Sequence, residues 1–164
     1  MEIWDLYTPE REPTGETMVR GDPIPPGRCH LVVHVWLQNA KGEWLISQRA
    51  AGRPNWPLMW ETVGGSVTAG EDSLAGALRE VKEEVGIDLM PDAGTCLKSC
   101  VRPGNDITDV WLFRYDGDID LSRATTDEVA RSRWMTAEEI GALRDGGELV
   151  PTLDYFFDLL APLA

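Results

Sequence analysis

GSVTAGEDSLAGALREVKEEVGI, residues 65–87, is the stretch of this chain that decides the fold. Its second half predicts an amphipathic helix, because apolar residues repeat there at helical spacing: Leu74, Leu78, Val81 and Val85. Asp72 or Ser73 can cap the first turn, and Gly86 stands where helices commonly end. The sequence therefore predicts one well-bounded helix that follows a glycine-containing loop.

Three glutamates of this helix, Glu80, Glu83 and Glu84, stand at positions i, i+3 and i+4. We expect their carboxylates to share one face, opposite the apolar stripe. Like charges at this spacing cost roughly 0.2–0.5 kcal/mol per pair, and the helix dipole disfavours them near the C-terminus. A solvated helix face is one interpretation. The other is a site for Mg²⁺ or Mn²⁺, because such cations require clustered oxygen ligands.

The same stretch fits the pattern G-x5-E-x7-R-E-U-x-E-E-x-G-U, with U a bulky aliphatic residue, at every defined position. It thus resembles the signature of the Nudix hydrolases, metal-dependent enzymes that cleave diphosphates. The resemblance implies an α/β fold, namely an α/β/α sandwich with a mixed sheet and a catalytic loop–helix–loop. It implies as metal ligands the carbonyl of Gly64 and the carboxylates of Glu80, Glu83 and Glu84. It also implies an ion bridge from Arg79 to Glu71 that orients Glu80.

The remaining elements fit one domain over residues 1–164, in which 1–28 form an N-terminal strand and a proline-rich extension packed on it. Alternating or continuous apolar runs predict strands at 3–7, 30–37, 44–48, 60–63, 95–101, 109–115 and 131–135. Two further helices are expected at 137–144 and 152–160, and a loop is expected at 9–15. This order of strands and helices favours a mixed sheet covered by helices.

A further carboxylate stands outside the signature. Glu128 precedes Trp134 by six residues, and members of the family often place an acidic residue before a Trp-containing strand. It is either an exposed loop residue or part of the catalytic group. A proton acceptor for the attacking water is required, and Glu83 or Glu128 is the candidate. Glu80 and Arg79 complete the predicted catalytic set.

Residues 28–60 resemble isopentenyl-diphosphate isomerase, a Nudix-fold enzyme without hydrolase activity, and the likeness extends over roughly residues 1–115. On that pattern Arg49 and Arg53 fall where the isomerase holds the diphosphate, and His30 falls on a metal-binding histidine. Two arginines four residues apart can also clamp phosphate oxygens on physical grounds. The catalytic cysteine of the isomerase is replaced by the run that starts at Thr62, and its acidic pair appears as Ile107 and Asp109.

Seven tryptophans are a heavy aromatic content for 164 residues. Four alternate with other apolar residues and are expected in the core: Trp36, Trp44, Trp60 and Trp134. Trp56 lies in the predicted loop between Arg53 and the signature. It either packs in the core or stacks on the organic part of a substrate.

The composition narrows the function classes further. With 28 acidic and 15 basic residues the formal charge is −13, which argues against a nucleic-acid partner. The three cysteines, Cys29, Cys96 and Cys100, are expected to be reduced thiols, and the start of the chain does not resemble a signal peptide. We therefore expect a cytoplasmic protein that binds neither nucleic acid nor membranes. A homodimer is a possible assembly, since many Nudix proteins form one.

Three functions remain for comparison at this point. The complete signature favours a hydrolase of a small-molecule diphosphate. Residues 28–60 favour an isopentenyl-diphosphate-type isomerase, which the missing cysteine opposes. A non-catalytic ligand-sensing Nudix module would be favoured by a degenerate signature. The group attached to the diphosphate stays open among nucleotides, nucleotide sugars, dinucleotides, coenzymes and isoprenoids.

Overall fold

The computed structural model, which describes residues 1–164, is built around the buried strand β3 (His30–Gln38). β3 pairs in parallel with β8 (Asp106–Arg114) along its whole length, and antiparallel with β6 (Val63–Ser66). A run of β-branched and apolar residues suits β3 to this position, because a central strand is covered on both faces. The predicted mixed sheet is confirmed.

The other elements follow the chain in order. The strands are β1 (Ile3–Tyr7), β2 (Pro13–Val19), β4 (Trp44–Arg49), β5 (Trp60–Glu61), β7 (Gly94–Arg102) and β9 (Val129–Met135). The α-helices are α1 (Ser73–Val85), α2 (Ala137–Asp145) and α3 (Phe156–Leu159). Short 3-10 turns lie at Pro91–Ala93, Leu121–Arg123, Pro151–Leu153 and Ala161–Leu163. No helix is long and apolar enough to traverse a lipid bilayer.

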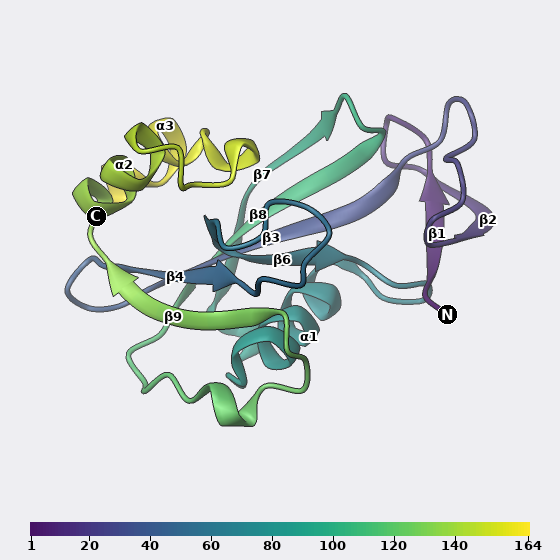
Figure 1. Ribbon diagram of the computed structural model, residues 1–164. Coiled ribbons are helices and arrows are strands. Elements are labelled where there is room, and N and C mark those ends of the chain that lie inside the picture. Colours follow the sequence, from purple (N-terminus) through teal and green to yellow (C-terminus); the bar gives the residue numbers. More distant parts are fainter.

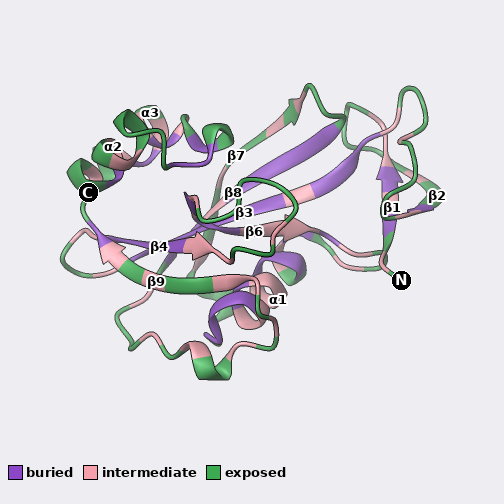
Figure 2. Ribbon diagram, viewed as in Figure 1, coloured by how far each residue is buried: buried purple, intermediate pink, exposed green.

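Alternation along β3 divides the core into two layers. Odd-numbered residues such as Val33 and Val35 pack with Val81 of α1 in one cluster. Even-numbered Trp36 packs with Phe156 of α3 in the other cluster. Figure 1 shows α1 on one side of the sheet and α2 and α3 on the other. Figure 2 shows that β3 and β8 are buried along most of their length. The molecule is thus the predicted α/β/α sandwich.

The ends of α1 are set by the residues that the sequence indicated. The side chain of Asp72 accepts a hydrogen bond from the Ala75 N–H at 2.8 Å, so Asp72 is the N-cap. Gly86 ends the helix in the left-handed region at φ 72°. A Cβ at this position would also lie 2.6 Å from the Cβ of Arg123, so both conformation and space require glycine.

Two predicted segments were wrong. Residues 9–15 were expected to be a loop, but Pro13–Val19 forms β2, which pairs with β1 in a separate two-stranded sheet. A proline is tolerated there because an edge strand needs no N–H on its outer side. Residues 152–160 were expected to be one helix, but only Phe156–Leu159 is α-helical. Short turns in this segment place Leu153, Phe156 and Leu160 in the core.

The tryptophans follow the expected pattern with two exceptions. Trp36, Trp44 and Trp60 are buried. Trp134 is half-buried and stacks on Tyr115, so the expectation of a core position holds only in part. Trp56 is 43% exposed, so the core interpretation is wrong for this residue. Its loop, between β4 and β5, leaves it beside the pocket described below.

Candidate active site

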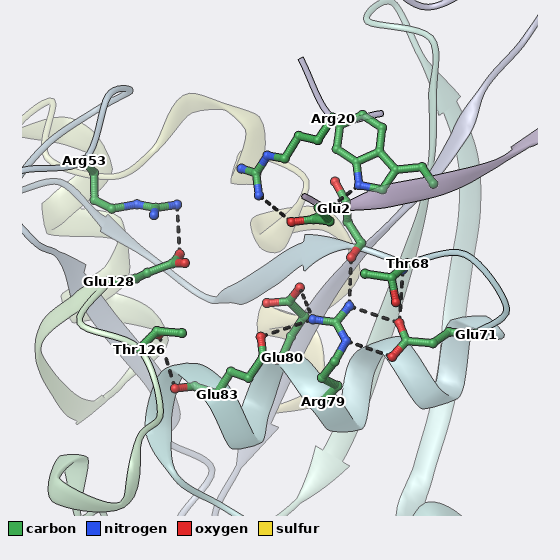
Figure 3. Close-up of polar contacts among 12 residues, drawn as sticks. Glu2, Arg20, Arg53, Thr68, Glu71, Arg79, Glu80, Glu83, Thr126 and Glu128 are labelled. Carbon is green, nitrogen blue, oxygen red and sulfur yellow. Dashed lines mark hydrogen bonds and ion pairs between the residues drawn. The ribbon is translucent and has the colours of Figure 1, made fainter. Parts of the chain in front are cut away.

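Arg79 fastens the loop of the signature to its helix. Its Nε donates to Glu71 Oε1 at 2.8 Å, and its Nη2 donates to Glu71 Oε2 at 3.0 Å and to the Ser66 carbonyl at 2.9 Å. Burial opposes ionisation of Glu71, but hydrogen bonds from Arg79 and Thr68 outweigh it and lower the pKa of this carboxyl. The ion bridge that the sequence suggested is therefore present (Figure 3).

The same guanidinium reaches two further glutamates. Nη1 of Arg79 donates to Glu80 Oε1 at 2.9 Å and to Glu83 Oε2 at 3.1 Å. One cation thus holds three carboxylates, and a planar fork with several donors suits arginine to this arrangement. The positions of Glu80 and Glu83 depend on Arg79 for this reason.

Gly65 leaves the space that Glu80 occupies. A Cβ at Gly65 would lie 2.3 Å from Glu80 Oε1, so any other residue would displace that carboxylate. A Cβ at Gly64 would lie 2.7 Å from the Val33 carbonyl, so the strand pairing there also needs glycine. Burial raises the pKa of Glu80 to about 7, with Arg79 opposing the shift and Glu83 and Glu128 adding to it.

Glu84 differs from the other two glutamates of the helix. It is buried, whereas the side chain of Glu83 is 36% exposed. Two full turns separate Glu84 from Ala77, so it lies on the sheet-facing side of α1. The expectation that all three carboxylates share one face opposite the apolar stripe is therefore wrong for Glu84.

Glu84 also lies among other carboxylates. Burial raises its pKa well above the ordinary value, and the charges of Glu80, Glu61 and Glu128 raise it further. Arg53 opposes this shift, but Glu84 forms no ion pair with it. A buried carboxylate in such surroundings is unfavourable unless a cation joins it.

Arg49 and Arg53 each have a carboxylate partner. Arg49 Nη1 donates to Glu61 Oε1 at 2.6 Å, and Arg53 Nη2 lies 2.8 Å from Glu128 Oε2. The sequence suggested that these two arginines clamp phosphate, and in the structure each is ion-paired with a glutamate. The structure places Glu128, which the sequence predicted, and Glu61, which it did not, near the glutamates of α1. The acidic group of this site thus consists of Glu61, Glu80, Glu83, Glu84 and Glu128. The sequence did offer one indication of Glu61, because a single charged residue follows Trp60 in a short strand just before the signature.

The donor chemistry of this group fits a hard divalent cation. The side-chain donors are all carboxylate oxygens, and the buried Glu84 has no ion-pair partner. No three acidic, histidine or cysteine side chains meet closely enough here to hold one ion. Glu80 and Glu83 are bonded to Arg79 instead. Ion binding would therefore require these side chains to turn.

A pocket of about 220 Å³ opens beside the acidic group, with Glu61, Gly64 and Gly65 in its wall. Its apolar lining comes from four residues: Val32, Trp56, Val150 and Leu153. The polar lining also includes His34, Arg102 and two threonines, Thr62 and Thr152. Burial lowers the pKa of His34 to about 3, so this imidazole is neutral near pH 7. The pocket can hold a small organic group next to the carboxylates.

The remaining isomerase-like positions lie apart from this pocket. His30 is buried and stacks on Trp4, with ring centroids 4.1 Å apart. Asp109 pairs with Arg11 at 2.6 Å. Asp109 aligns with Val33 in the sheet, so it lies on the α1 face, whereas His34 lies on the opposite face. These residues have structural partners in this fold.

Comparisons with known proteins identify the family of this chain. Residues 29–156 match the family described as the NUDIX domain. The chain is 40% identical over 158 residues to a protein of Listeria monocytogenes described as an uncharacterised Nudix hydrolase, covering 96% of this chain and 91% of that one. A crystal structure from Deinococcus radiodurans superposes with a TM-score of 0.75 at 25% identity, covering 99% of this chain and 96% of that one.

The likeness to the isomerase is more limited. The Escherichia coli isopentenyl-diphosphate Delta-isomerase is 35% identical over 65 residues, which are 39% of this chain and 36% of that enzyme. This is shorter than the resemblance expected over roughly residues 1–115. The complete signature, the sandwich fold and the match over most of the chain agree on one assignment. The chain belongs to the Nudix hydrolase family.

Proposed function

We propose that this protein hydrolyses the diphosphate link of a small molecule, with Mg²⁺ or Mn²⁺ as cofactor. One observation carries the proposal: Glu84 is buried among Glu61, Glu80 and Glu128, and burial and these charges raise its pKa. A structural helix gains nothing from this arrangement, because unpaired buried charge is destabilising. A divalent cation converts the same group into a favourable site.

The ligands that we propose are Glu80, Glu83, Glu84 and the carbonyl of Gly64. A bound divalent cation would supply positive charge against the negative charge that builds up on the phosphate oxygens, and would lower the pKa of a bound water. Arg79 holds Glu80 and Glu83 by hydrogen bonds before the ion arrives. Gly65 keeps the space in which Glu80 lies.

The protein side chains then handle the proton and the substrate. Water attacks one phosphorus atom, the bridging P–O bond breaks, and two phosphorylated products leave. We propose Glu83 or Glu128 as the acceptor of the water proton, since both belong to the acidic group and are partly exposed. We propose that Arg53, whose side chain is 26% exposed, also donates to a phosphate oxygen, and that Arg49, which is paired with Glu61, lies near the same oxygens. Trp56 would contact the organic group.

Charge and composition support the rest of the proposal. An acidic protein takes an anionic substrate when bound cations reverse the local sign. The chain's formal charge of −13 does not favour a nucleic acid or an anionic membrane surface as a partner. We propose a small molecule as the only substrate, a cytoplasmic location, and a single domain over residues 1–164 that can form a homodimer.

A screen of diphosphate compounds with Mg²⁺ or Mn²⁺ tests this function. We expect phosphate-containing products from at least one compound, identified by mass, and no products in excess EDTA. Full activity in EDTA would refute the cofactor. Failure with every compound would favour the ligand-sensing alternative. Deuterium uptake by isopentenyl diphosphate in deuterated water would favour the isomerase alternative, which the partial sequence match keeps under test.

A further inference from the structure

A buried chain of hydrogen bonds ends in the pocket beside Gly64 and Gly65. Trp36 Nε1 donates to the Tyr155 hydroxyl at 2.9 Å, and that hydroxyl lies 2.8 Å from His34 Nδ1. The indole N–H can only donate, so the tyrosine oxygen accepts from Trp36 and its own proton is free to go elsewhere. His34 Nδ1 is the acceptor in reach.

These two hydrogen bonds fix the tautomer of His34. Nδ1 accepts the tyrosine proton, so the ring proton of the neutral imidazole is on Nε2. The other tautomer would aim two N–H groups at one oxygen and leave the tyrosine proton without an acceptor. Nε2 would carry a proton in the imidazolium form too, so the direction of donation does not depend on the charge state.

Nε2 of His34 is the atom at the end of these hydrogen bonds that a ligand can reach. His34 lines the pocket, and its Nε2 makes no hydrogen bond within the protein. Nδ1 of His30 is sealed from solvent without a partner, whereas Nε2 of His34 is not sealed. An unpaired donor on a buried histidine that lines a partly apolar pocket favours ligands that carry an acceptor, because an unpaired donor is costly once water is excluded.

Two polar neighbours of His34 in the pocket are bonded mainly within the protein. Arg102 also lines the pocket, but its Nε and Nη2 both donate to Asp106, at 2.7 and 2.9 Å. Thr62 donates to the Val35 carbonyl at 2.7 Å. Trp56 supplies an exposed aromatic surface on the same pocket. His34 aligns with Gly64 in the sheet, so a group held by His34 lies next to the acidic side chains.

We infer that His34 is a specificity-determining residue, which donates from Nε2 to a hydrogen-bond acceptor on the group attached to the diphosphate. Tyr155 and Trp36 are positioning residues that set this donor. The inference rests on the proposed function for its substrate. The pocket then selects a planar, acceptor-bearing group such as a nucleobase and disfavours an isoprenoid hydrocarbon, which would leave Nε2 unpaired.

The first test needs no substrate. The chain has two histidines, so nitrogen NMR of the ¹⁵N-labelled protein gives two imidazole patterns, and His30→Gln removes one to assign the other. We expect the proton of His34 on Nε2, and a mixture of tautomers in Tyr155→Phe. A proton on Nδ1 in the unaltered protein would overturn the inference.

The second test uses binding of nucleoside monophosphates and isopentenyl monophosphate, followed by the same NMR signals. We expect at least one nucleotide to shift the His34 Nε2 resonance, and the isoprenoid to leave it unchanged. His34→Leu should weaken that nucleotide about tenfold, His34→Gln should restore part of the affinity through its amide N–H, and His30→Gln should change nothing. Equal binding by His34→Leu, or a shift with the isoprenoid alone, would overturn the inference.

Activity separates this inference from the proposed function. If no diphosphate is hydrolysed, the proposed function fails, and the binding test still decides the role of His34. If hydrolysis occurs and His34→Leu keeps the kcat/KM of nucleotide substrates, the inference fails and the hydrolase remains. We expect His34→Leu to lower kcat/KM about tenfold for the preferred nucleotide, mainly through KM.

Discussion

Arg79 and Arg53 lie on two sides of the same carboxylates and are held in different ways. Arg79 bonds Glu71, Glu80 and Glu83, and all of these partners are within eight residues of it. Arg53 has one carboxylate partner, Glu128, from a distant segment of the chain, and its Nε has none. The two side chains are equally exposed, at 25% and 26%. Arg79 therefore holds a local structure together, whereas Arg53 is held by a single ion pair and can more easily turn toward a ligand.

The largest expected effect is that of Arg79→Ala. It removes the partner of three carboxylates, so we expect loss of activity and a fall in the free energy of unfolding of about 2–4 kcal/mol. Arg53→Ala is the matched control and should cost less than about 1 kcal/mol, because it removes one partly exposed pair. Denaturant unfolding without metal measures both. Equal losses in the two variants would remove the contrast between them.

Glu83→Gln comes next and affects activity alone. Glu83 is 36% exposed and bonds only Arg79 through its side chain, so the fold should persist. We expect kcat to fall at least about a hundredfold, the usual size of a general-base or metal contribution. Glu138→Gln, an exposed change on α2, is the control and should keep full activity. A Glu83→Gln enzyme with normal kcat would leave Glu128 as the proton acceptor.

Glu84→Gln should stabilise the metal-free protein near pH 7 while it weakens metal-dependent activity. The substitution removes a buried carboxyl that must either carry a charge among other carboxylates or take up a proton on folding, and we expect a gain of about 1–3 kcal/mol. For a domain of this size that corresponds to a Tm rise of roughly 2–4 °C per kcal/mol. Thermal unfolding in EDTA measures it. A lower Tm for Glu84→Gln would mean that this carboxylate has a stabilising partner.

The sign of the pH dependence follows from the same group. A carboxyl whose pKa is raised by folding binds more protons in the folded state than in the unfolded chain. Its contribution to stability therefore falls as pH rises through the window between the two pKa values. For Glu80 that window extends from the ordinary 4.5 to about 7. The metal-free protein should lose stability across it, and added Mg²⁺ should reduce the loss.

The smallest expected effect is that of Arg53→Ala on substrate binding. A contact made equally in the ground state and the transition state changes KM and leaves kcat nearly unchanged. We expect KM to rise about tenfold, which equals about 1.4 kcal/mol, and Arg53→Lys to restore part of it. Steady-state kinetics on the preferred diphosphate measures this. An unchanged KM would mean that Arg53 serves Glu128 alone.

Local patterns allowed much of the fold to be predicted. The caps of α1, the strands around β3 and the bridge from Glu71 to Arg79 each depend on residues close in sequence. Segments at the edges were less predictable, such as β2, where Pro13 and Gly15 suggested a loop. The pairing of β2 with β1 depends on a partner strand, which no local pattern contains.

The sequence by itself determined the helix and, through its signature, the family and the bridge from Arg79 to Glu71. Helical periodicity and capping are short-range, so the residue order contains the physical information for them. Only the tertiary structure decided that Glu84 is buried, that Glu61 and Glu128 join it, and that Arg49 and Arg53 are paired. The pocket, with His34 from β3 and Tyr155 from the C-terminal segment, was decided in the same way. These contacts join residues far apart in the chain, and packing of the two layers on the sheet brings them together.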